Sequence, residues 1–189
     1  MRYLPQVCFV DIFLPSGYTK QETERGGAMF LEGREIAETT GHEAGRALLR
    51  EMYLRYGGGP VPDITVTERG KPYFVDSPWK FSISHTPRHV FCALSKNNIG
   101  IDAEERDRQI RLQLAEKILS AAEKERFAKA EDPRMALLKL WVLKEAQVKF
   151  TGDGLQGYPT HTDFTLSDPR VRELQGCLVA VIEEEEYVI

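Results

Sequence analysis

Apolar and polar positions divide the first part of the chain into one strand-like and one helix-like stretch. Residues Val7 to Leu14 are rich in Val, Ile and Phe and predict a strand, which a turn at residues 15–17 ends. A mainly polar stretch follows. From about Arg34 to Tyr56 apolar residues recur near one side of a helix, and the segment Gly57 to Pro60 ends this pattern. We therefore expect a strand and then a helix that carries Arg46.

The middle of the chain carries short apolar segments between turn-forming residues, which predict strands. These segments are Ile64 to Thr67, Phe81 to Ser84, Val90 to Leu94 and Ile99 to Ile101. Asn97 and Asn98 fill the gap between the last two segments, and a short, turn-prone gap favours a β-hairpin. We therefore expect these two segments to pair with each other.

Helical spacing returns between Ile110 and Ala130. A longer helix is expected up to Phe150, because Asp132 and Pro133 form a favourable N-cap and first-turn pair and Gly152 is a typical stop. Strand-like composition returns in the tail, at Asp163 to Leu166 and Leu178 to Ile182. Strands mixed with helices, without a regular strand and crossover-helix alternation, indicate an α+β fold.

The composition is that of a folded, mildly acidic protein. Its 189 residues are 42% hydrophobic, which suffices for a buried core, and the formal net charge is −4. This charge gives no general attraction to nucleic acid or to an anionic membrane, and no stretch approaches the roughly 20 apolar residues of a membrane span. We therefore expect a soluble, cytoplasmic protein without a targeting segment, which binds neither nucleic acid nor membrane.

The three cysteines are Cys8, Cys92 and Cys177. They lie far apart in the sequence and show neither the ligand spacing of a zinc site nor the pattern of a disulfide framework. The spacing argues against both and favours reduced thiols in the cytosol.

Two carboxylates follow an apolar strand in the sequence Gly-Ile-Asp-Ala-Glu at residues 100–104. Asp102 and Glu104 are two positions apart, so an extended backbone directs both side chains to the same side. Mg²⁺ typically takes one or two carboxylates and leaves its other positions to water and phosphate. On spacing alone, however, an exposed strand end is the more common explanation of such a pair.

The long predicted helix carries a second group of polar residues. Trp141, Glu145 and Lys149 are four positions apart and therefore share one face. An ordinary Glu–Lys surface pair beside a core tryptophan is the more frequent origin of this pattern.

A third group lies in the segment Phe-Ser-Ile-Ser-His-Thr at residues 81–86. A phosphate could accept hydrogen bonds from Ser84 and His85, and Lys71, held in a Gly-Lys-Pro turn, is a further candidate phosphate partner. Each has a plain alternative, a structural histidine in one case and a solvent-exposed lysine in the other.

Taken together and in order, five blocks resemble the signature of the 4'-phosphopantetheinyl transferase superfamily, particularly its surfactin-synthetase-activating (Sfp) type. The blocks are RGKPYF, FSISHT, IGIDAE, SAAEKERF and LWVLKEAQVKFTGDGL, within a resemblance that runs from Arg46 to about Phe164. The GID-x-E and W-x-x-KE-x-x-x-K blocks are the most specific. The resemblance implies a 4'-phosphopantetheinyl transferase-like fold of two similar α+β halves related by a pseudo-twofold axis. The halves are expected at residues 1–98 and 99–189, with coenzyme A in the cleft between them.

The resemblance also implies a role for each matching residue. Asp102, Glu104 and Glu145 would bind Mg²⁺ beside the pyrophosphate of coenzyme A. Coenzyme A itself would be contacted by Arg46, Lys71, Ser84, His85 and Lys149. The residues implied in catalysis are Glu145, Lys149 and Glu123, the last at an acidic position near the metal. Three carboxylates in one cleft would raise one another's pKa values unless a divalent cation compensated them, which agrees with a bound metal.

The implied activity is that of a holo-carrier-protein synthase. A serine hydroxyl of an acyl or peptidyl carrier protein would attack the β-phosphate of coenzyme A, and 3',5'-ADP would leave. Mg²⁺ would neutralise the developing charge, Lys149 would hold the leaving phosphate, and Glu145 would remove the serine proton directly or through water. A monomer is expected because the cleft forms within one chain.

Two other functions stay open at this point. One is a non-catalytic module of the same fold that binds coenzyme A or a carrier protein, and the other is an unrelated metal-dependent phosphohydrolase. The intact acidic residues speak against the first, and the absence of a histidine-rich or two-metal ligand pattern speaks against the second. The N-terminal stretch departs from the family, since it lacks the usual basic cluster before the Arg46 helix, and Arg34 is a candidate substitute for the missing 3'-phosphate contacts.

Overall fold

The computed structural model describes residues 12–14, 18–22, 28–154 and 159–184, and for residues 12–14, 18–22 and 28 it describes the backbone alone. The strands are β1 (Ile12–Leu14), β2 (Tyr18–Glu22), β3 (Ala28–Glu35), β4 (Ile64–Val66), β5 (Pro72–Phe74), β6 (Lys80–His85), β7 (His89–Ser95), β8 (Ile99–Glu105), β9 (Val171–Leu174) and β10 (Cys177–Glu183). The helices are α1 (Gly41–Tyr56), the 3₁₀ turn η1 (Leu112–Leu114), α2 (Ala115–Ile118), α3 (Ala121–Ala128) and α4 (Pro133–Thr151).

Two antiparallel sheets divide most of the strands between them. The first has the order β1-β2-β3-β7-β6, and the second has the order β8-β10-β9. Strands β4 and β5 form a separate two-stranded hairpin. The strands of the first sheet come from residues 12–95 and those of the second from residues 99–183, so the described chain passes from one sheet to the other at residues 96–98.

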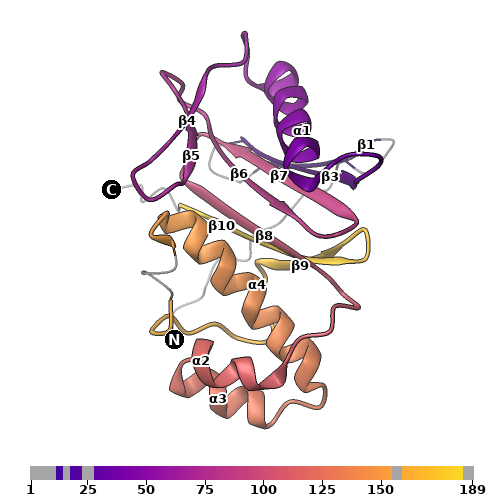
Figure 1. The fold of residues 1–189 in the computed structure, drawn as a ribbon, viewed down its shortest axis with the longest axis vertical. Helices are drawn as coiled ribbons and strands as arrows, with labels where there is room; N and C mark the ends of the chain where they lie inside the picture. Colours follow the sequence, from indigo (N-terminus) through magenta and orange to yellow (C-terminus); the bar gives the residue numbers. More distant parts are fainter. Residues whose placement is uncertain (1–11, 15–17, 23–27, 155–158, 185–189) are drawn as a thin grey trace.

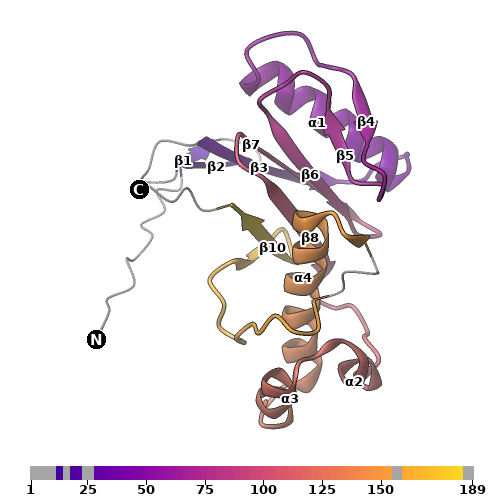
Figure 2. The same cartoon turned by 90° about the vertical axis from the view of Figure 1, so that its left-hand side faces the viewer.

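Each of the two larger sheets is covered by helices on one face and packs against the other sheet through its opposite face. Helix α1 packs on the first sheet through Leu48, Leu49 and Met52, and α4 packs on the second through a fully buried row that includes Leu137 and Val142. A third apolar cluster, which joins β3 and β7 to β8 and β10, fills the space between the sheets. Figures 1 and 2 show the resulting order, with α1 outside one sheet and α2, α3 and α4 outside the other.

The edge strands β6 and β8 meet through side chains instead of a backbone ladder. Ser82 Oγ accepts the N–H of Ile101 at 3.0 Å, and Ser84 Oγ accepts the N–H of Ala103 at 3.1 Å. Both serines are buried, and both contacts advance by two residues along each strand. This serine seam, defined by Ser82 and Ser84, joins the two sheets beside the predicted site.

Helix α4 forms where the sequence predicts it, because both of its ends carry the expected signals. The Asp132 side chain accepts the N–H of Met135, Pro133 occupies the first turn, and Gly152 ends the helix with a φ of 74°. The helix lies close to β8, since a Cβ added to Gly100 would come within 2.2 Å of the Ala146 carbonyl oxygen. Gly100 therefore sets the approach of α4 to the strand that carries Asp102.

The α+β class is confirmed, but several element predictions are wrong. Residues 28–35, read as part of a polar stretch and the start of a helix, form β3, whose Met29 and Leu31 face the inter-sheet cluster. Helix α1 begins only at Gly41, after a capping box made by Thr40 and Glu43. By contrast, the helical prediction at 110–130 is confirmed over most of its length, as η1, α2 and α3, with a break where Ser120 caps a new helix.

Three further predictions concern strand pairing and the tail. The expected hairpin across Asn97 and Asn98 is wrong, because β7 pairs with β3 and β6 whereas β8 pairs with β10. Residues 163–166 are not a strand, and β9 at Val171–Leu174 was not predicted, whereas β10 covers the predicted strand at 178–182. Most of the strand predicted at 7–14 lies outside the described residues. None of the helices in the described ranges has the length and apolar character needed to cross a membrane.

Candidate functional site

Strand β8 presents the predicted carboxylates to helix α4. Ile101 and Ala103 turn into the inter-sheet cluster, so the alternate residues Gly100, Asp102 and Glu104 face the helix. Asp102 is only 6% exposed. The two predicted ligands on this strand therefore lie on one face and in a partly enclosed position, not at a solvated strand end.

Lys149, Asp102 and Ser84 form a closed group at the C-terminal part of α4. Lys149 Nζ donates to Asp102 Oδ1 at 2.7 Å and to Ser84 Oγ at 3.0 Å, and the Ser84 hydroxyl donates to the same Asp102 oxygen at 2.9 Å. Ser84 also accepts the N–H of Ala103, so its one donor and two acceptor positions are all used. An α4 residue and a β6 residue thus converge on one carboxylate of β8.

The second oxygen of Asp102, Oδ2, is bonded differently from the first. Asp102 Oδ2 is buried and has no hydrogen-bond partner among the described residues. A buried carboxylate oxygen without a partner is costly unless a cation or a polar ligand group completes it. This oxygen is the feature of the site that best fits a metal ion, and a carboxylate oxygen is the donor that Mg²⁺ prefers.

Glu104 is held at the other end of the same face. Trp141 Nε1 donates to Glu104 Oε1 at 2.9 Å, and Arg108 forms a salt bridge with the same oxygen. The Arg108 guanidinium also lies over the Trp141 ring, 5.7 Å from its centroid. Sequence reasoning found Trp141 but missed Arg108, whose position in the loop after β8 gave no signal.

Glu145 lies one helical turn from Trp141 and one from Lys149, on the face of α4 that these residues share. Since Trp141 contacts Glu104 and Lys149 contacts Asp102, Glu145 is placed along the helix between the levels of the two carboxylates. It is half-buried and has interactions of its own. The structure therefore brings the predicted carboxylates to facing sides of one helix–strand contact.

Ligand-type side chains gather more tightly elsewhere. Within residues 28–154 and 159–184, three side chains bring potential ligand atoms within 4.8 Å of one another: His89, Glu105 and Cys177. Within these ranges the predicted carboxylates do not form such a group. All three predicted carboxylates could therefore contact one ion only if their side chains moved closer together, and water or phosphate oxygens would fill its other positions, as is usual for Mg²⁺.

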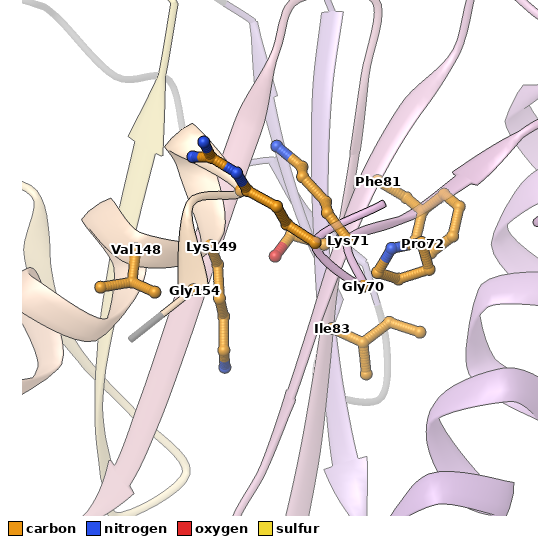
Figure 3. A pocket seen from close by; sticks show the side chains of 11 residues that line it. Gly70, Lys71, Pro72, Phe81, Ile83, Val148, Lys149 and Gly154 are labelled. Atoms are coloured by element: carbon orange, nitrogen blue, oxygen red, sulfur yellow. The ribbon is translucent and has the colours of Figure 1, made fainter. Parts of the chain in front are cut away.

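A cavity of about 230 Å³ opens beside Lys149. Its walls come from the β4–β5 turn, from β6 and from the end of α4, and they carry three cations: Arg69, Lys71 and Lys149. Figure 3 shows Lys71 and Lys149 reaching the cavity from different elements, with Phe81, Ile83 and Val148 as apolar parts of the wall. Arg69 pairs with Asp153 and Lys149 pairs with Asp102, so these two cations would share their charge between a carboxylate and a bound anion. Basic and apolar side chains around one cavity suit an anion attached to an apolar or extended group.

Lys71 lines this cavity, but its ammonium group is directed at the protein. Lys71 Nζ donates to Phe150 O at 2.7 Å and to Asn98 Oδ1 at 2.8 Å. Desolvation by burial, with a smaller contribution from the charge of Lys80, lowers the pKa of Lys71. In the structure Lys71 therefore joins the β4–β5 hairpin to the end of α4, and its contact with a phosphate stays a prediction.

Ser84 and His85 lie on opposite sides of β6. Ser84 points to β8, whereas the exposed His85 ring lies against the N-terminus of α1, where a Cβ added to Gly41 would come within 2.6 Å of it. Arg46, half-buried, lies in the second turn of the same helix. The structure thus places His85 and Arg46 near one helix N-terminus, which favours anions, and separates them from the Ser84 group.

Glu123 occupies a fully buried position on α3. Glu123 Oε2 accepts the N–H of Ser120 and pairs with Lys144 Nζ at 2.9 Å, and Oε1 accepts the N–H of Phe164. Glu123 and Lys144 are both 0% exposed. These contacts give Glu123 a role in a capping box with Ser120 and in the core, and they do not bring it to Asp102.

Comparison with known proteins points in one direction. Residues 98–185 match the family model described as the 4'-phosphopantetheinyl transferase superfamily. Sfp, a 4'-phosphopantetheinyl transferase of Bacillus subtilis (strain 168), is 38% identical over 116 residues, which cover 59% of this chain and 51% of that protein. A second 4'-phosphopantetheinyl transferase of Bacillus subtilis is 32% identical over 147 residues, covering 71% of this chain and 65% of the relative.

A third relative is the 4'-phosphopantetheinyl transferase gsp of Aneurinibacillus migulanus, 29% identical over 147 residues, with 76% of this chain and 60% of that protein covered. The chain thus spans between 51% and 65% of the length of these three curated relatives. The matched region contains β8, α4 and the carboxylates that face each other across them. Residues 98–185 thus match the 4'-phosphopantetheinyl transferase superfamily, and over a longer span the chain is similar to curated 4'-phosphopantetheinyl transferases, Sfp among them.

Proposed function

We propose that this protein transfers the 4'-phosphopantetheine group of coenzyme A to a serine of an acyl or peptidyl carrier protein. The observation that carries the proposal is Asp102, which has one buried oxygen without a partner among the described residues. Its other oxygen pairs with Lys149, and Lys149 also lines the cavity. The relatives are named as transferases of this group, which supports the same activity here.

The site is proposed to lie in a cleft between two halves, residues 1–98 and 99–189. In support, the seam between β6 and β8 and the cavity both draw on residues from each side of this division. His85 and Arg46, at the N-terminus of α1, are proposed to receive the 3'-phosphate end of coenzyme A. The cations of the cavity are proposed to contact its pyrophosphate. We further propose that the protein acts as a cytoplasmic monomer.

Asp102, Glu104 and Glu145 are proposed to hold Mg²⁺. When bound, the ion would supply charge neutralisation to the phosphate oxygens during transfer. The open Asp102 oxygen offers one ligand without any rearrangement, whereas the Glu104 oxygen that contacts Arg108 and Trp141 is already neutralised by a cation.

The chain's own residues would then position the reacting groups. Lys149, fixed by Ser84 and Asp102, would direct an ammonium group at the phosphate that leaves as part of 3',5'-ADP. Glu145, one turn earlier on the same helix face, would accept the proton of the carrier serine. Most of the rate enhancement would come from holding these groups in place, since phosphoryl transfer needs little covalent participation by the protein.

Intact-mass spectrometry of apo carrier proteins tests the proposal. The carrier would be incubated with this protein, coenzyme A and Mg²⁺, and a gain of one phosphopantetheine group, about 340 Da from its composition, is expected. Asp102→Ala should abolish the gain, whereas the matched control Asp63→Ala, at an exposed acid between α1 and β4, should retain it. Folded protein that binds coenzyme A but modifies none of a panel of fatty-acid, polyketide and peptide-synthetase carriers would support a binding module instead.

A further inference from the structure

A second cluster of ligand-type side chains lies on the face of β8 that points away from α4. His89 comes from β7, Glu105 from the end of β8 and Cys177 from the start of β10. Their exposed fractions are 8%, 5% and 0%, so the cluster is buried. It joins strands of both sheets and lies outside the site proposed for coenzyme A.

The potential ligand atoms of this cluster lie close together. His89 Nδ1 lies 3.1 Å from Glu105 Oε1, and Cys177 Sγ lies 3.5 Å from both His89 Nδ1 and Glu105 Oε2. Nitrogen, oxygen and sulfur atoms bound tetrahedrally to one Zn²⁺ lie roughly 3.3–3.6 Å from one another, given metal–ligand bonds of about 2.0–2.3 Å. His89 and Cys177 contact different oxygens of Glu105, so the carboxylate would have to turn to offer one oxygen to an ion that both residues bind. One ligand atom from each of the three residues lies within 4.8 Å of the others, which leaves this adjustment small.

We propose that His89, Glu105 and Cys177 bind one Zn²⁺ ion, in a site separate from the Asp102 group. The mixed imidazole, carboxylate and thiolate set suits Zn²⁺ and does not suit Mg²⁺, which prefers oxygen ligands alone. A water molecule would complete a four-coordinate set. The Thr86 hydroxyl is already used, since it donates to Glu105 Oε1 and accepts the N–H groups of Arg88 and His89. The two sites lie back to back, since Glu104 and Glu105 are neighbours that face opposite sides of β8.

The surroundings of Glu105 orient it as a ligand. Arg88 Nη2 donates to Glu105 Oε2 at 2.8 Å and is itself held by Asp107. Such outer contacts fix the direction of a ligating carboxylate. The charges also balance, because Glu105 and a Cys177 thiolate neutralise the ion while Asp107 neutralises Arg88.

The Cys177 thiol would lose its proton only when Zn²⁺ binds. Burial raises the pKa of Cys177 to about 12, so the metal-free thiol keeps its proton. Burial alone would raise the pKa of Glu105 as well, but hydrogen bonds from Arg88, Thr86 and His89 outweigh it and lower this pKa to about 2. Binding would thus replace the thiol proton with a Zn–S bond, release that proton to solvent, and leave His89 with its proton on Nε2.

The fold creates this site from residues that sequence spacing does not connect. His89 and Glu105 are 16 positions apart, and Glu105 and Cys177 are 72 apart. No short zinc motif contains them, so the spacing argument against a zinc site holds for local motifs and not for residues that three strands bring together.

Titration of the purified full chain with Co²⁺ and Zn²⁺, with Mg²⁺ in excess to occupy the carboxylate site, tests the proposal. A Cys8→Ser background removes a cysteine outside the described residues. Co²⁺ should produce a sulfur-to-metal charge-transfer band at one equivalent, Zn²⁺ should displace it, and Zn²⁺ should raise the thermal unfolding midpoint. Elemental analysis should find one Zn²⁺ per chain.

Two buried cysteines give a matched pair of variants. Cys177→Ala should remove the band and the Zn²⁺-dependent stabilisation, whereas Cys92→Ala, at the other buried cysteine, should keep both. His89→Gln should keep a weakened band and reduce Zn²⁺ affinity by at least about tenfold, which tests the site even if Cys177→Ala does not fold. No band in the parent protein, or the same band and affinity in Cys177→Ala or His89→Gln, would overturn the proposal.

Discussion

The Ser84 hydroxyl makes three hydrogen bonds at once, to Lys149, to Asp102 and to the N–H of Ala103. It thereby fixes a cation, a carboxylate and the edge of β8 relative to one another. Its sequence position matches a phosphate-contact block, and composition gives no sign that the side chain turns toward β8. Only the pairing of β6 with β7 and the approach of β8 determine this direction.

Ser84→Ala should therefore lower both stability and activity. Lys149, Asp102 and the Ala103 amide would each lose a partner, which costs about 1–3 kcal/mol of unfolding free energy and on the order of tenfold in transfer rate. Urea unfolding and carrier modification rates measure the two effects. Ser82→Ala removes the equivalent seam contact but leaves the Lys149–Asp102 pair, so a rate loss as large as that of Ser84→Ala would contradict the assigned role.

Lys144 and Glu123 form an ion pair that is fully buried between α4 and α3. Lys144 Nζ also donates to the carbonyl oxygens of Pro159 and Thr162, so it holds the chain that follows α4. Lys144→Met would leave a buried carboxylate without its cation, and we expect a loss of about 3–5 kcal/mol in a chemical unfolding experiment.

The double variant Lys144→Met with Glu123→Gln should cost less than the two single changes added together. This cycle separates a structural role from the catalytic role that the family resemblance implies for Glu123. A Glu123→Gln protein with unchanged unfolding free energy and a large loss of transfer rate would support the catalytic role instead.

At the scale of elements, the contact between α4 and β8 decides the geometry of the site. Gly100 faces the helix backbone, and even one methyl group there would meet the carbonyl oxygen of Ala146 and the backbone of Phe150. Gly100→Ala should push α4 away from β8 and cost about 1–3 kcal/mol or more, because both neighbours are backbone atoms that cannot rotate aside.

The thermal midpoint and the Mg²⁺ dependence of transfer measure this effect. Gly59→Ala is the control, since a methyl group at Gly59 meets nothing within 4 Å and should change stability by no more than about 0.5 kcal/mol. Equal stability of the two variants would show that α4 can shift without cost.

Sequence predicts best those elements whose end signals are local. Helix α4 has a capping aspartate, a first-turn proline and a terminal glycine, and its start and end follow from them. Strand β3 was missed because it is buried on both faces, which hides the alternation, and because Glu32 and Gly33 make it look polar. Glu32 is tolerated there because Arg55 and Tyr56 of α1 reach its carboxylate, a contact between distant segments that no local pattern shows.

At the scale of the whole molecule, Lys71 connects parts that the chain order keeps apart. It joins the β4–β5 hairpin to Asn98, at the passage between the sheets, and to the last turn of α4. Lys71 can reach Asn98 and α4 together because β7 and β8 belong to different sheets. The short gap at Asn97 and Asn98 instead predicts that these two strands pair with each other. A turn-prone gap specifies a reversal of direction, not the strand with which each neighbour pairs.

Lys71→Met should loosen the wall of the cavity. We expect KM for coenzyme A to rise several-fold, with a smaller change in kcat, because Lys71 shapes the cavity while Lys149 and the carboxylates are untouched. Lys80→Met removes a neighbouring exposed charge and serves as the control in steady-state kinetics. A fall in kcat with an unchanged KM would instead indicate that Lys71 acts during the chemical step.

The serine seam has a spectroscopic consequence. The amides of Ile101 and Ala103 are protected by side-chain oxygens of the opposite sheet, so their exchange with deuterium depends on the sheets staying together and not on a ladder within either one. These two amides would exchange when the seam opens while both sheets remain folded. Their exchange rates, followed by NMR, would therefore measure how strongly coenzyme A and a carrier protein hold the two sheets together.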